Sequence, residues 1–61
     1  MIVKTLLDGL HYDGQLALRR KTKNWYDYLA AGDQTKMKYK YGYYEVERAC
    51  IIDGVLVIYV E

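Results

Sequence analysis

Few side chains in this sequence have the types and spacing that catalysis requires. His11 is the only histidine, so it alone has an ordinary pKa near neutrality and could serve as a general base. Cys50 is the only thiol, and it is expected in the middle of a strand on the core face, where cysteine behaves as a small hydrophobic residue. Asp8 and Asp13 flank His11 at a spacing that matches no known metal loop, and the glycine after each aspartate is typical of a turn. We therefore expect no enzyme activity and no bound metal or cofactor.

Lysine and tyrosine side chains alternate in the segment 36–41, which reads Lys-Met-Lys-Tyr-Lys-Tyr. A period of two predicts a β-strand, with the lysines on one face and the rings on the other. A two-residue turn at 42–43 then pairs two lysines with two glutamates of the next strand: Lys40 with Glu45 and Lys38 with Glu47. Cross-strand ion pairing explains these lysines better than a nucleic-acid site does, because the alternation separates them from the rings.

Basic residues are concentrated in the middle of the chain and offer an alternative function. As phosphate contacts for a nucleic acid we select the cations Arg19, Arg20, Lys21, Lys23 and Lys36. The first four belong to a predicted helix, in which Arg20 and Lys23 fall opposite the apolar stripe with Arg19 beside them. A basic helix face is most often simply solvated. The net charge of +1 provides no overall attraction for polyanions.

The amino-terminal half is predicted to hold one strand and one helix. Residues 2–7 form a short apolar run that ends at an Asp-Gly turn, which is typical of a strand. Strong helix formers and an apolar stripe at helical spacing predict a helix over 15–31, although Leu16 falls on its polar side. The alternative is a strand at 16–20 followed by a short helix at 24–31.

The carboxyl-terminal third predicts a β-hairpin. Two apolar segments, 44–52 and 55–60, flank Asp53-Gly54, a strong type I′ turn signal. This turn sets the register, which pairs Ile52 with Val55 and, further along, Cys50 with Val57 and Arg48 with Tyr59. Residues 1–61 are thus expected to form a single α+β domain with the order β-α-β-β-β, in which one helix covers a mostly antiparallel sheet of about four strands.

The two faces of this predicted sheet suggest where a partner binds. Alternation puts Arg48 and Tyr59 on the face that the helix is expected to cover, and the pair has the composition of a binding hot spot. On the other face lie aliphatic residues that no second helix is left to cover. We therefore predict a partner-binding surface formed by Ile51, Leu56, Ile58 and Val60 together with Arg48 and Tyr59.

The predicted function is a non-enzymatic protein–protein interaction module. We expect a homodimer, formed through this surface or by edge pairing of strands, that also binds another protein. A small inhibitor or adaptor encoded by a phage or mobile element fits this size and lack of motifs. Nucleic-acid binding is the alternative, and capture of a small anionic ligand between dimer-related tyrosines is a third. The longest apolar run, 55–60, is too short to cross a membrane, and no signal peptide is evident, so we expect a cytoplasmic protein.

Overall fold

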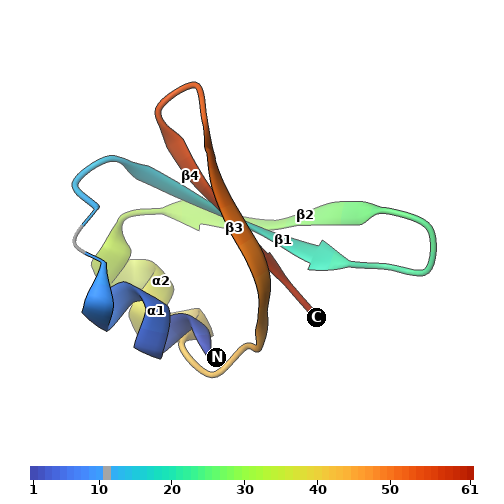
Figure 1. Cartoon of the computed structure of the whole chain (residues 1–61), viewed down its shortest axis with the longest axis horizontal. Helices are drawn as coiled ribbons and strands as arrows, with labels where there is room; N and C mark the ends of the chain where they lie inside the picture. Colours follow the sequence, from blue (N-terminus) through green and yellow to red (C-terminus); the bar gives the residue numbers. More distant parts are fainter. Residues whose placement is uncertain (11) are drawn as a thin grey trace.

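A computed structural model describes residues 1–10 and 12–61, and His11 lies outside the described residues. Two helices and four strands follow one another in the order α1 (Val3–Gly9), β1 (Gln15–Lys21), β2 (Tyr26–Gly32), α2 (Gln34–Tyr41), β3 (Val46–Ile52) and β4 (Val55–Val60) (Figure 1). The strands form one sheet in the order β2-β1-β4-β3, in which only the central pair, β1 and β4, is parallel. The predicted class, a small α+β domain with a mostly antiparallel four-stranded sheet, is confirmed.

The elements of the amino-terminal half differ from those predicted. Residues 2–7 were expected to be a strand, but most of them belong to helix α1, because Val3 and Leu7 are one helical turn apart and both are buried. Residues 15–31 form the antiparallel hairpin β1–β2 instead of one helix. The alternative interpretation was right about the strand at 16–20 and wrong about the helix at 24–31.

The lysine-rich segment 36–41 is also helical, which corrects the predicted hairpin. Asp33 caps α2, since its carboxylate accepts a hydrogen bond from the backbone N–H of Lys36 at 2.8 Å. Met37 is buried and Tyr41 is half-buried one turn later, so the inward side follows a helical period. The predicted lysine–glutamate ladder is therefore absent from the ion pairs of the described residues.

The ion pairs that do form join other partners. They link Lys38 with Asp8, Lys21 with Glu47 at 3.6 Å, and the Met1 ammonium group with Glu45 at 2.6 Å.

The carboxyl-terminal hairpin is confirmed in both turn and register. Asp53 has a φ of 52° and Gly54 a φ of 77°, as a type I′ turn requires of its two central residues. The three predicted pairs, Ile52–Val55, Cys50–Val57 and Arg48–Tyr59, all occur. A bulge between Val46 and Arg48 interrupts the ladder at the start of β3.

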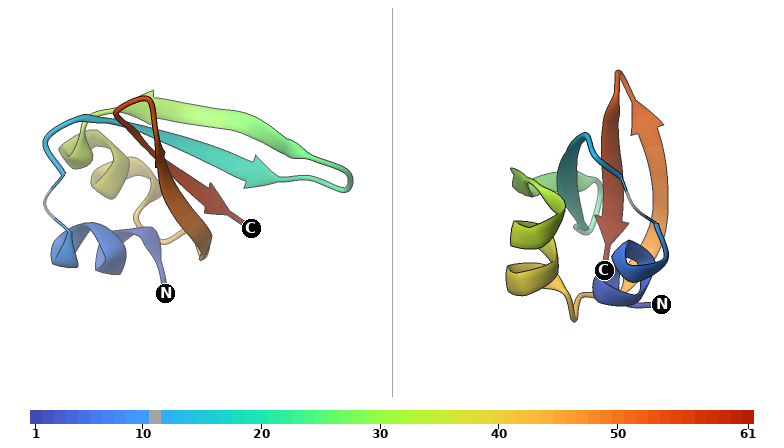
Figure 2. Two further views of the ribbon diagram at one scale, coloured as in Figure 1. Left: turned by 45° about the horizontal axis from the view of Figure 1, so that its top comes forward. Right: turned by 90° about the vertical axis from the view of Figure 1, so that its left-hand side faces the viewer.

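Both helices lie on the same side of the sheet (Figure 2). α2 packs on β1 and β2, and α1 packs against α2. The fully buried core lies between the sheet and these helices and consists of Val3, Leu7, Leu16, Leu18, Met37, Ile58 and Val60, with Leu56 nearly as buried. The helices therefore cover the face that the sequence analysis left uncovered, and the face with Arg48 and Tyr59 points away from them. We call this second face, which carries Arg19, Arg48 and Tyr59, the open face.

Candidate functional site

The predicted partner-binding surface is mostly interior. Ile58 and Val60 are completely buried and Leu56 is 3% exposed, so in this fold these three side chains cannot contact a partner. The prediction was wrong for these three residues because the two helices cover their face of the sheet, and not the face with Arg48 and Tyr59. Ile51 is 60% exposed, since it lies on the edge strand β3 beyond the reach of the helices.

Arginine and tyrosine alternate across all four strands of the open face. The register places Tyr28 of β2 beside Arg19 of β1, Arg19 beside Tyr59 of β4, and Tyr59 beside Arg48 of β3. Directly paired residues of a sheet point to the same face, so these four side chains form one row. We call Tyr28, Arg19, Tyr59 and Arg48 the Tyr/Arg row.

Arg48 is stacked on Tyr59 of this row and also lies near the ring of Tyr26, which pairs with Lys21. Its guanidinium carbon lies 4.5 Å from the centroid of the Tyr59 ring and 5.9 Å from that of Tyr26. The two rings meet edge to face, with centroids 4.8 Å apart and planes at 71°. Tyr59 is only 9% exposed, so Arg48 rather than the ring beneath it is presented to solvent. A guanidinium plane held in this way can still receive a second flat group on its outer side.

Glu47 forms an ion pair and accepts a hydrogen bond at one end of the open face. Its Oε2 lies 3.6 Å from Lys21 Nζ, and its Oε1 accepts a hydrogen bond from the Tyr26 hydroxyl at 2.8 Å. This hydrogen bond to a carboxylate, with a contribution from desolvation, raises the pKa of Tyr26 above its ordinary value of 10.0. The Tyr26 hydroxyl therefore remains a donor to Glu47 further into the alkaline range than an ordinary tyrosine would.

The turn between β1 and β2 holds an exposed tryptophan. The Thr22 hydroxyl donates to the Trp25 carbonyl oxygen at 2.7 Å and accepts from the Trp25 N–H at 3.1 Å. The Thr22 N–H donates to the same carbonyl oxygen at 2.6 Å. These contacts fix the backbone of the turn, while 73% of Trp25 remains exposed.

A cavity of about 810 Å³ runs along this part of the open face. Its described lining contains four cations and three aromatic rings and no carboxylate: Arg19, Lys21, Lys23, Arg48, Trp25, Tyr26 and Tyr59, with Thr22, Asn24 and Ile52. Within the part of the chain that the structure describes, Arg19, Lys23 and Arg48 form no salt bridge. The site thus offers unpaired positive charge next to flat aromatic surface.

The five cations selected from the sequence lie on different surfaces of the structure. Arg19, Lys21 and Lys23 reach the open face. Arg20 points to the side of the helices, where its guanidinium lies 5.9 Å from the Tyr44 ring centroid. Lys36 is on α2 and its ammonium group lies 3.5 Å from the carbonyl oxygen of Ala31. Strand alternation separates Arg20 from its neighbours, which the helical interpretation could not do.

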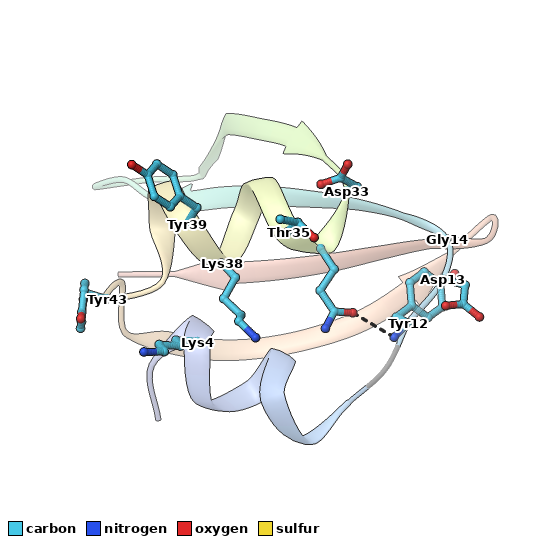
Figure 3. Close-up of a pocket in the computed structure, with 10 residues that line it drawn as sticks. Lys4, Tyr12, Asp13, Gly14, Asp33, Thr35, Lys38, Tyr39 and Tyr43 are labelled. Atoms are coloured by element: carbon cyan, nitrogen blue, oxygen red, sulfur yellow. Dashed lines mark hydrogen bonds between the residues drawn. The ribbon is translucent and has the colours of Figure 1, made fainter.

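A second cavity, of about 840 Å³, lies between the two helices and the loop that follows α1 (Figure 3). Lys38 extends from α2 toward α1, where it pairs with Asp8. Gln34 connects α2 with α1 and with Tyr12. Its side-chain oxygen accepts a hydrogen bond from the Tyr12 N–H at 3.2 Å, and its side-chain nitrogen donates to the Leu7 carbonyl oxygen at 3.0 Å. These polar groups are already engaged with the protein, so this cavity is less suited to a ligand than the open face.

Among the described residues, the candidate catalytic and metal groups form no site. Cys50 is exposed on β3, which corrects its expected place in the core, and the prediction for His11 lies outside the described residues. Across residues 1–10 and 12–61, no three His, Cys, Asp or Glu side chains are grouped so as to hold a metal ion. Nor does this described part contain a helix long and apolar enough to span a membrane.

Sequence reasoning missed the aromatic side chains of the site, namely Trp25, Tyr26 and Tyr28. The signal that could have found them is the alternation of Tyr26 and Tyr28 around Asp27, which is typical of a strand. Comparison of the chain with protein families, curated proteins and solved structures finds no match.

Proposed function

We propose that the protein binds single-stranded nucleic acid through its open face. The observation that carries this proposal is the Tyr/Arg row, which crosses the whole sheet and adjoins the exposed ring of Trp25. Proteins that bind single strands combine a cationic surface for the backbone with flat side chains on which the bases stack. The open face supplies both on one surface, unlike the segment 36–41, whose lysines and rings were expected on opposite faces of a strand.

Some exposed side chains of the open face are suited to stack on bases and others to contact phosphates. Trp25 and Tyr28 are 73% and 66% exposed, so their rings are available for base stacking. Arg48 is backed by Tyr59 and can take a third base on its outer side, since guanidinium planes also stack with bases. Arg19 and Lys23 lack carboxylate partners among the described residues and are placed to contact phosphates.

A single strand suits this surface better than a duplex. Bases of a duplex are stacked on one another and present only their edges in the grooves. The rings of the open face would then have no base plane to contact, and only the phosphate contacts would remain. We therefore expect the protein to prefer single strands over a duplex of the same sequence.

Fluorescence anisotropy with labelled single-stranded DNA and RNA oligonucleotides tests the proposal. Each phosphate contact with a single strand contributes about −0.7 to the slope of log K against log salt, so the two phosphate contacts proposed for Arg19 and Lys23 predict a slope of about −1.4. Loss of one stacked base in Trp25→Ala should weaken binding by about 5- to 150-fold, the equivalent of ~1–3 kcal/mol. Lys23→Ala should weaken binding and make the slope less steep by about 0.7, whereas Arg48→Ala should weaken binding with little change of slope, because Arg48 contacts a base.

Lys40→Ala is the matched control, because it removes one exposed positive charge from α2 rather than from the open face. It should leave affinity nearly unchanged. Equal losses in Lys40→Ala and Arg48→Ala would show that binding depends only on total charge, and would contradict a site on the open face. No measurable binding at low salt would refute the proposed function altogether.

A further inference from the structure

One edge of the sheet has an exposed apolar segment that is open to strand pairing. β3 is an edge strand, and its residues 48–52 are all exposed, with Ile51 at 60% and Ile52 at 49%. Ile51 is paired with Leu56 and so lies on the side of the helices, while Ile52 is paired with Val55 on the open face. Large aliphatic side chains are thus exposed on both sides of the same edge.

Among residues 1–10 and 12–61, the contacts made by the chain itself occupy only the beginning of this edge. The N–H of Val46 donates to the Met1 carbonyl oxygen at 2.7 Å, and Ile2 forms an antiparallel bridge with Glu45. The bulge between Val46 and Arg48 then separates this part from the regular ladder that follows. Natural edge strands are usually protected by charges, proline or bulges, and the segment 49–52, Ala-Cys-Ile-Ile, has none of these.

We infer that β3 pairs antiparallel with β3 of a second copy of this chain, with the twofold axis at Cys50. The regular segment 48–52 is centred on Cys50, so this axis pairs the whole segment with its symmetry mate. Arg48 then faces Ile52, and the small Ala49 faces the large Ile51.

Charge and side-chain volume favour a second copy of the chain as the partner of β3. No cation faces a cation in this register, because Arg48 is the only charged residue of the segment and never meets its own copy. A net charge of +1 for each chain causes little repulsion between two copies. The pairing would bury both isoleucines and join two four-stranded sheets into one, with both open faces on the same side because alternation is preserved. The inference does not depend on the proposed nucleic-acid binding.

Sedimentation equilibrium of the purified chain at increasing concentration tests the pairing. We expect the mass to rise to twice the 7.2 kDa of one chain, and Ile51→Lys to keep the mass of one chain at the same concentrations. Ile51 is exposed, so this variant should fold, which circular dichroism can verify. Tyr43→Lys is the matched control, since Tyr43 is also a large exposed residue but lies on the loop after α2.

Cross-linking then tests the register. Directly opposed strand residues have Cα atoms about 4.5–5.5 Å apart, within the range that a disulfide spans. Mild oxidation with copper–phenanthroline, which removes two electrons and two protons from a pair of thiols, should therefore join two chains through Cys50, and Cys50→Ser should abolish the product.

Three results would overturn the inference. They are a mass of one chain at all concentrations, a dimer that survives Ile51→Lys, and a dimer that does not cross-link through Cys50. Trp25→Ala, which tests the nucleic-acid site, should leave dimerisation unchanged, so failure of one proposal can be told from failure of the other.

Discussion

Two isoleucines on neighbouring strands allow a direct test of which sheet face the helices cover. Ile58 of β4 and Ile51 of β3 point to the same side of the sheet, because they pair with Ala49 and Leu56 respectively on that side. Ile58 is completely buried beneath the helices, whereas Ile51 is 60% exposed at the edge. Truncation of each to alanine removes the same atoms, so any difference in the free energy of unfolding reports coverage by the helices.

The expected costs differ severalfold. Truncation of a buried isoleucine to alanine costs ~2–5 kcal/mol, because the transfer free energy is lost and a cavity is left. A domain of 61 residues has a total free energy of unfolding of roughly 3–9 kcal/mol at ~0.05–0.15 kcal/mol per residue. Ile58→Ala should therefore remove about half of the stability or more. Ile51→Ala should change it by ~0.5 kcal/mol or less, as is usual for exposed positions.

Urea unfolding followed by far-ultraviolet circular dichroism measures both variants. The experiment belongs at low protein concentration, where the proposed association of β3 would not add to the apparent stability. A lower midpoint with an unchanged m-value is expected for Ile58→Ala. If Ile51→Ala proved as costly as Ile58→Ala, or more so, the arrangement of helices and sheet described above would be refuted.

Three further predictions concern local features. Asp33→Ala should cost ~1 kcal/mol of unfolding free energy in urea titrations, because α2 loses the cap that binds the Lys36 N–H; an unchanged midpoint would contradict this role. Gly54→Ala should cost ~1–2 kcal/mol by the same measurement, since a side chain at a φ of 77° is strained, and no loss would argue against the type I′ turn. The pKa of Tyr26, followed by ¹³C NMR of its ring, should fall toward 10.0 in Glu47→Gln. Because the pKa of Tyr26 is raised in the folded state, its contribution to the free energy of unfolding is fully present below pH 10 and is lost as the pH rises through the folded-state pKa. The wild type should therefore lose more stability above pH 10 than Glu47→Gln does.

The carboxyl-terminal hairpin was predicted because its signals are local. Asp53-Gly54 suits the positive φ angles of a type I′ turn, and such a turn fixes the register of the strands on either side. Few other conformations satisfy both the turn and the flanking apolar segments. The sheet of the α+β class could be predicted for the same reason, whereas both helices lie mainly in segments that were predicted to be strands.

The segment 36–41 was predicted wrongly because its pattern fits two periods. Its lysines alternate with apolar residues, but Met37 and Tyr41 are also one helical turn apart. The cap at Asp33 favours the helix, and so does the space above β1 and β2 that Met37 fills. For 15–31 the opposite happened: residues with good helix propensity became strands because β1 lies between β2 and β4 in the sheet. The misfit of Leu16 in the predicted helix was the warning, since Leu16 and Leu18 are both buried on one face of β1.

The sequence by itself determined the class of the domain, its last hairpin and the cations of the proposed binding surface, because turn chemistry, alternation and residue type are properties of a few neighbouring residues. Only the tertiary structure decided which sheet face became the core. Both faces of β4 are apolar, so alternation alone cannot choose between them. The choice depends on where α1 and α2 pack, and it buries Leu56, Ile58 and Val60 while leaving Arg19 and Arg48 together on the open face.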